Sequence, residues 1–103
     1  MDLLTDELRS RLPPLHAQEA EGDPMVYIRY FLPGAEQSWY VCEGQDEGEE
    51  YLFFGFVSFD DYGFRCFLLS ELQAIRGPQG QCVERDVAFT EGRLTDVVPA
   101  PDL

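Results

Sequence analysis

The chain contains no lysine, and all seven of its cationic side chains are arginines. This absence excludes the lysine of a phosphate-binding loop, a Schiff-base lysine and a serine–lysine nucleophile pair. There is a single histidine, His16, directly after the segment Leu12-Pro13-Pro14-Leu15. A lone histidine beside a Pro-Pro turn is typical of a surface or packing position, so we do not expect it to act in catalysis.

Cysteine is also scarce, with three residues at Cys42, Cys66 and Cys82 and no C-x-x-C pair. The separations do not favour a zinc site, and each cysteine falls in or directly beside a predicted strand, where we expect it to be a small buried hydrophobe. An odd number without disulfide spacing indicates a reducing compartment. The N-terminal residues are acidic rather than basic, and no apolar run approaches the roughly 18 residues of a membrane span. We therefore expect a cytoplasmic protein with no membrane contact.

Positive charge is scarce overall: twenty Asp and Glu against seven Arg leave a formal net charge of −13. Nucleic acid and anionic membranes both attract positive charge, so neither is expected to bind this chain directly. With 103 residues, 45% of them hydrophobic and 14% aromatic, the chain is expected to form one globular domain with one core. The aromatic content excludes a disordered chain.

Two short helices are predicted. Thr5 is a suitable N-cap, Asp6 and Glu7 favour the first turn, and Pro13 ends this first helix. The second helix is predicted to begin with a capping box in which Ser70 is the cap, and to end at Gly77.

Runs rich in β-branched and aromatic residues predict five strands, at 25–31, 38–43, 51–59, 64–69 and 83–89. The run at 51–59 is apolar on both faces, which predicts an interior place in the sheet. Short connections favour antiparallel pairing. The sequence therefore predicts an α+β fold, a single domain over 1–90 with an antiparallel sheet of four to five strands and two short helices, followed by a loosely ordered tail over 91–103.

Several short motifs occur in an order that resembles an uncharacterised family of small bacterial proteins, known only as a domain of unknown function. The resemblance covers about residues 3–90. It implies a single small domain encoded on plasmids, phages and integrative elements, and it implies no activity and no catalytic residues. The motifs are Thr5-x-Glu7-Leu8, Leu12-Pro13-Pro14-Leu15, Trp39-Tyr40-Val41-x-Glu43, Phe53-Phe54-Gly55, Glu71-Leu72, Arg76-Gly77-Pro78-x-Gly80 and Glu84-Arg85-Asp86.

Acidic residues are concentrated between Arg29 and Arg65, a window with no basic residue. Carboxylates spread along an extended edge imitate the charge of phosphates, and so can occupy a basic nucleic-acid groove of another protein. The alternative is a solvated charge run that only keeps a small domain soluble. The candidate partner-binding residues are Glu36, Glu43, Asp46, Glu47, Glu49, Glu50, Asp60 and Asp61.

Two other kinds of site are weaker. The acids at 46–50 offer oxygen ligands for Ca²⁺ or Mg²⁺, but their spacing does not fit an EF-hand loop. The aromatic residues Trp39, Tyr40, Phe53, Phe54 and Phe56 exceed what one face of a thin sheet can bury. If the helices cover one face, the other is expected to expose a Tyr or Trp as a binding patch or dimer contact.

The sequence thus favours a non-enzymatic acidic interaction protein that uses no cofactor, metal or catalytic residue. We expect it to bind a basic protein or nucleoprotein complex, as anti-CRISPR and anti-restriction proteins do, and to be a monomer or weak homodimer. One alternative is a plasmid or conjugation accessory protein that binds through an exposed aromatic sheet face. The other is a small carboxylate- or metal-dependent hydrolase.

Overall fold

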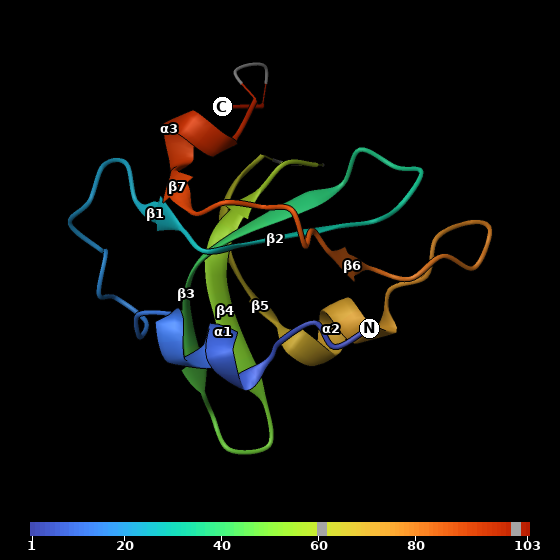
Figure 1. The fold of residues 1–103 in the computed structure, drawn as a ribbon, viewed down its shortest axis with the longest axis horizontal. Coiled ribbons are helices and arrows are strands. Elements are labelled where there is room, and N and C mark those ends of the chain that lie inside the picture. The colour runs from blue at the N-terminus through green and yellow to red at the C-terminus, as the bar shows by residue number, and fades with distance from the viewer. Residues whose placement is uncertain (60–61, 100–101) are drawn as a thin grey trace.

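The computed structural model describes residues 1–59, 62–99 and 102–103. In these ranges the chain forms three short helices and seven strands (Figure 1). The elements are α1 (Asp6–Arg11), β1 (Met25–Val26), β2 (Ile28–Phe31), β3 (Ser38–Asp46), β4 (Tyr51–Val57), β5 (Gly63–Leu68), α2 (Leu69–Ala74), β6 (Glu84–Arg85), β7 (Gly92–Arg93) and α3 (Leu94–Val97). None of the helices in these ranges has the length and apolar character that a membrane span requires.

A five-stranded antiparallel sheet in the order β5-β4-β3-β2-β6 forms the centre of the molecule, and β1 and β7 form a second, two-stranded sheet. The α+β prediction is therefore confirmed. The run at 51–59 does give an interior strand, because β4 lies between β3 and β5. The run at 25–31 is divided at Tyr27, since β1 pairs with β7 whereas β2 pairs with β3.

One face of the large sheet carries the main core, covered by the N-terminal segment, α1 and α2. Thr5 Oγ1 accepts a hydrogen bond from the Leu8 amide at 3.2 Å, which confirms the predicted cap of α1. The second predicted cap is wrong. The chain passes directly from β5 into α2, so Leu68 rather than Ser70 is the N-cap, and the Leu68 amide donates a hydrogen bond to the Glu71 carboxylate at 2.9 Å. The core side chains on this face include Leu3, Leu4, Leu12, Ile28, Tyr30, Trp39, Val41, Phe53, Phe67 and Leu72.

Residues 92–98 are ordered and packed, unlike the loose tail predicted for 91–103. Gly92 and Arg93 pair with β1, and α3 places Leu94 and Val98, 5% and 3% exposed, on the second face of the large sheet. These two side chains are four residues apart, the spacing of one helix face. They pack with Val26, Tyr40 and Phe56, so the domain extends at least to residue 98.

The predicted strand at 83–89 is mostly wrong, because only Glu84 and Arg85 pair with β2. Asp86 then turns the chain: its Oδ1 accepts the Ala88 amide at 3.1 Å, and its carbonyl accepts the Phe89 amide at 3.2 Å. In such a turn the aspartate side chain binds the backbone in place of a neighbouring strand, so the strand ends at Arg85.

Candidate functional site

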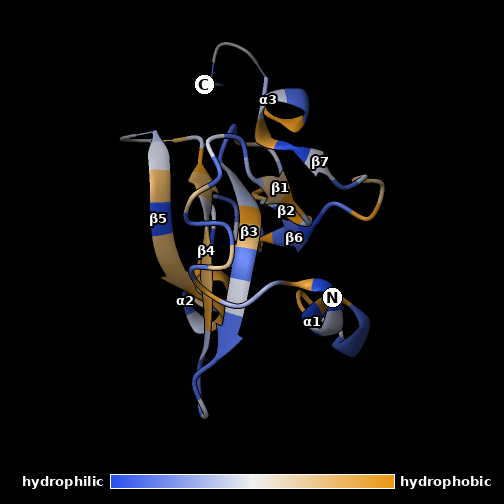
Figure 2. Ribbon diagram, turned by 90° about the vertical axis from the view of Figure 1, so that its left-hand side faces the viewer, coloured by the Kyte–Doolittle hydropathy of each residue, from blue (hydrophilic) through white to orange (hydrophobic). Residues whose placement is uncertain are grey.

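The β3–β4 hairpin ends in an acidic turn, and we call the side chains of Asp46, Glu47, Glu49 and Glu50 the acidic hairpin. The Glu47 amide donates to the Glu50 carbonyl at 2.8 Å, and Asp46 Oδ1 accepts the Gly48 amide at 2.8 Å. Gly48 has a φ of +89°, a conformation that favours glycine. All four carboxylates are exposed at the end of the molecule, where the ribbon is hydrophilic (Figure 2).

Contacts with both neighbouring helices hold this hairpin in place. Arg9 of α1 lies 3.4 Å from an Asp46 carboxylate oxygen and stacks 5.0 Å from the centre of the Tyr51 ring. Ser70 of α2 donates a hydrogen bond to Glu50 at 2.8 Å. Within the described ranges, Glu47 and Glu49 have no ion pair. The turn of the acidic hairpin is thus held through Asp46 and Glu50, while the Glu47 and Glu49 carboxylates are exposed to solvent.

The structure places Glu36 and Glu43, two other predicted partner-binding residues, away from this group. Glu36 is exposed, but it lies in the β2–β3 connection at the opposite end of β3. Asp60 and Asp61 lie outside the described residues. Among the described residues, the structure therefore brings together the four hairpin residues and leaves Glu36 apart from them.

Glu43 is a correction, because its side chain is buried rather than presented to a partner. It is 3% exposed, and its two carboxylate oxygens accept the amides of His16 at 2.8 Å and Gln18 at 2.7 Å. A β-bulge between Val41 and Glu43 determines which face of the sheet Glu43 occupies. It makes Glu43 pair with Phe54 and places it on the second face of the sheet, against the segment that follows α1. Alternation without a bulge would place Glu43 on the face of Val41.

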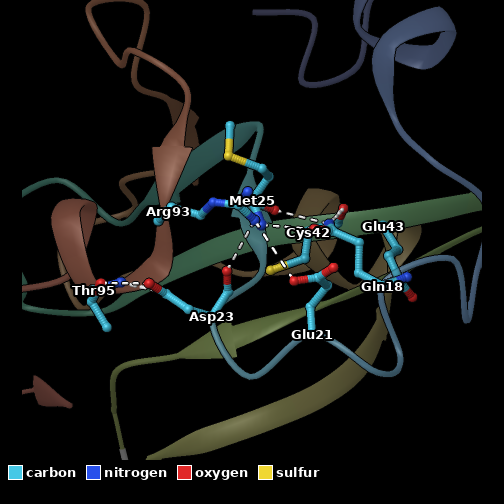
Figure 3. Close-up of polar contacts among 8 residues, drawn as sticks. All are labelled: Gln18, Glu21, Asp23, Met25, Cys42, Glu43, Arg93 and Thr95. Atoms are coloured by element: carbon cyan, nitrogen blue, oxygen red, sulfur yellow. Dashed lines mark hydrogen bonds and ion pairs between the residues drawn. The ribbon is translucent and has the colours of Figure 1, made fainter.

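A second polar contact fixes the same segment, residues 15–24, across β3 (Figure 3). The Gln18 side-chain amide donates to the carbonyls of Met25 at 3.1 Å and Cys42 at 3.0 Å, and its oxygen accepts the Met25 amide at 2.7 Å. At the C-terminal end of the segment, Asp23 accepts the backbone amide of Thr95 at 3.0 Å and its hydroxyl at 2.7 Å. The segment is therefore bound to β1, β3 and α3.

The Asp23 contact gives a pH-dependent prediction. Hydrogen bonds from the side chain and backbone of Thr95 lower the pKa of Asp23 below its ordinary value. These bonds favour the carboxylate, so they persist below the pH at which an unfolded aspartate is protonated and are lost as the pH falls through the depressed pKa. In an NMR titration, the Thr95 amide shift should have its midpoint below the ordinary aspartate pKa, and Thr95→Val should move the Asp23 midpoint upward. A titration midpoint at the ordinary aspartate pKa would contradict the hydrogen bonds from Thr95 to Asp23.

Residues 15–24 form one wall of an apolar groove on the second face of the sheet, with a volume of about 320 Å³. The Phe54 and Phe64 rings stack at 5.5 Å between centres, and Phe64 is 45% exposed. Trp39 is buried in the main core and Tyr40 is buried on the second face, so neither is the exposed aromatic residue that was expected, and Phe64 is an exposed ring of this groove. The groove is lined by Leu15, His16, Gln18, Glu19, Glu21, Pro24, Cys42, Glu43, Phe54, Phe64 and Cys66.

The cysteines differ from one another. Cys42 is buried, as predicted, and burial raises the pKa of its thiol to about 12, which makes it unreactive. Cys66 and Cys82 are exposed, so the prediction that all three are buried is wrong. Among the described residues, no group of three or more His, Cys, Asp or Glu side chains is arranged to hold a metal ion.

The comparison with family models decides where the chain belongs. The model described as protein of unknown function (DUF2958) matches residues 3–98. The chain is a member of this family. The match confirms the resemblance to a domain of unknown function, and it includes β7 and α3, which the resemblance over 3–90 did not. Neither the curated proteins nor the solved structures provide a match.

Proposed function

We propose that this DUF2958 protein is a non-enzymatic interaction protein whose acidic hairpin binds the basic nucleic-acid-binding site of another protein. The observation that supports it is the clustering of four exposed carboxylates at one turn, with Arg9 as the cation contacting them in the described ranges. The net charge of −13 adds long-range attraction toward a basic surface. Arginine and lysine side chains that bind phosphates form the same charge-assisted hydrogen bonds with carboxylates.

The rigidity of the turn strengthens the proposal. The hairpin is already held by Arg9, by Ser70 and by the hydrogen bonds within the turn. Its backbone therefore loses little conformational entropy when a partner binds. The resemblance to proteins of plasmids, phages and integrative elements favours a host defence complex as the target. Such a target requires a cytoplasmic protein that acts by blocking access of DNA or RNA.

Two charge-matched variants test the proposal. Glu47→Gln/Glu49→Gln/Glu50→Gln removes three charges from the acidic hairpin, and glutamine at position 50 retains an acceptor for Ser70. The control, Glu36→Gln/Glu84→Gln/Asp96→Asn, removes three charges from exposed positions elsewhere. Each immobilised protein is exposed to a bacterial lysate, washed with rising salt and analysed by mass spectrometry.

We expect the wild type and the control to retain the same basic nucleic-acid-binding protein. The hairpin variant should retain it at least about tenfold more weakly, because several close charge pairs are lost together. Equal retention by the two triple variants would overturn the proposal, since only the total charge would then matter. Failure to retain any basic protein would also overturn it.

A further inference from the structure

The two edges of the large sheet differ in a way that leaves one of them open. At one edge, β6 has two residues, and the N-terminal segment covers it: the Arg85 amide contacts the Met1 sulfur at 3.1 Å, and the Arg85 guanidinium donates to the Asp2 carbonyl. At the other edge, β5 has six residues, and in the described ranges no strand pairs with its outer side (Figure 2). An open edge strand presents unpaired N–H and C=O groups to a partner chain.

The open edge borders the apolar groove, because β5 contributes both Phe64 and Cys66 to the groove lining. α3 covers the part of this face around Tyr40 and Phe56, whereas the Phe54–Phe64 pair remains accessible. A strand added to β5 would place alternate side chains over this face. A partner strand could thus form main-chain hydrogen bonds with β5 and pack apolar side chains against the adjacent Phe54–Phe64 pair.

The charges around the groove specify the chemistry of its occupant. Glu19 and Glu21 are exposed in its lining, and no arginine in the described ranges lines it. Glu21 forms an exposed ion pair with Arg93 at 4.0 Å. His16 contributes its exposed ring, 3.6 Å from Glu19, and the buried Glu43 carboxylate is occupied by backbone amides. The rim is therefore acidic above an apolar floor.

We propose that an extended basic segment of a partner protein adds to β5 as a sixth strand. Its apolar side chains pack against Phe54 and Phe64, and its lysine or arginine side chains face Glu19 and Glu21. This mode of binding uses main-chain hydrogen bonds for affinity and alternate side chains for specificity. A second copy of this chain suits the groove poorly, because it carries a net charge of −13 and brings a second acidic rim.

The wall of the groove is formed before binding. Glu43 and Gln18 fix residues 15–24 through five hydrogen bonds to or from the backbone. A preformed wall reduces the ordering cost of binding a flexible segment. This second binding surface does not depend on the acidic hairpin, which lies where β3 ends and β4 begins.

Synthetic peptides test the proposal directly. The probe is a fluorescent, capped octapeptide in which lysine alternates with valine and leucine, and binding is followed by fluorescence anisotropy and by shifts of the β5 amides in NMR spectra. In one control peptide, glutamate replaces every lysine. Two others carry N-methyl groups on alternate residues, each blocking hydrogen bonding along one edge of the peptide. We expect the lysine peptide to bind, with the glutamate peptide and one of the two N-methylated peptides at least about tenfold weaker.

Protein variants locate the site. Phe64→Ser should weaken peptide binding about tenfold, and Val87→Ser, at an exposed position outside the groove, should not change it. Glu19→Gln/Glu21→Gln should weaken it about fivefold, whereas Glu36→Gln/Glu84→Gln should have no effect. Circular dichroism confirms folding, and the glutamate variants provide the test if Phe64→Ser does not fold.

Three results would overturn the proposal. The first is no binding of the lysine peptide, and the second is equal binding of both N-methylated peptides and the parent. The third is a dimer in sedimentation velocity that Phe64→Ser dissociates, which would make a second copy the occupant. The hairpin triple variant should fail to capture its partner from the lysate and still bind the lysine peptide. That result would show that the groove and the acidic hairpin bind independently.

Discussion

The Glu43→Ala variant is expected to unfold with a free energy about 3 kcal/mol lower than that of the wild type. The change removes the acceptor of the His16 and Gln18 amides and leaves a void where the buried carboxylate was. Urea denaturation followed by circular dichroism measures the difference. The Gln18 amide should also lose protection in hydrogen exchange, because the segment at 15–24 loses this attachment to β3.

The matched control is Glu47→Ala in the same hairpin. Glu47 is exposed, and its side chain has no hydrogen bond or ion pair in the described part of the structure, so this variant should change the free energy of unfolding by less than about 0.5 kcal/mol. If both variants were equally stable, Glu43 would be a surface carboxylate, and the preformed groove wall would lose its physical basis.

Gly55→Ala is expected to lower the free energy of unfolding by about 3 kcal/mol or more. Gly55 lies opposite Val41 in the interior pair of β3 and β4. A Cβ atom at this position would lie 2.1 Å from the carbonyl oxygen of Tyr40 and 2.9 Å from its carbonyl carbon. Both are backbone atoms, so the two strands themselves would have to separate.

Gly22→Ala controls for the general effect of replacing a glycine. A Cβ atom at Gly22 would have nothing within 4 Å, so its effect should be below about 1 kcal/mol. The two variants are compared in thermal and urea denaturation. If Gly55→Ala were as stable as Gly22→Ala, β3 and β4 would not approach each other as closely beside the bulge as the structure shows.

Much of the fold follows from local sequence signals. The runs that form β3, β4 and β5 combine aromatic and β-branched residues with short connections, and these give antiparallel neighbours without long-range information. Thr5 followed by two acids identified the start of α1 correctly. The order of residues 92–98 depends on the pairing of β7 with β1 and on the packing of Leu94 and Val98 against the sheet, which are tertiary contacts that the local sequence does not reveal.

The candidate site was less accessible to sequence reasoning. The exposure of the acids at 46–50 follows from their place at the turn between β3 and β4. The position of Glu43 beneath residues 15–24 depends on a bulge, and neither alternation nor charge reveals a bulge. The groove joins residues 15–24 to Phe54 and Phe64, which are far apart in sequence, and only the tertiary arrangement shows that α3 stops short of them.

Competition with nucleic acid tests the central claim most directly. A fluorescent DNA or RNA duplex is bound to the purified basic protein that the wild type captures, and the chain is then titrated into the complex. We expect the duplex to be released as the chain binds, with the hairpin triple variant requiring about tenfold more protein and the charge-matched control behaving as the wild type. A ternary complex, in which the chain binds while the duplex remains bound, would contradict the account.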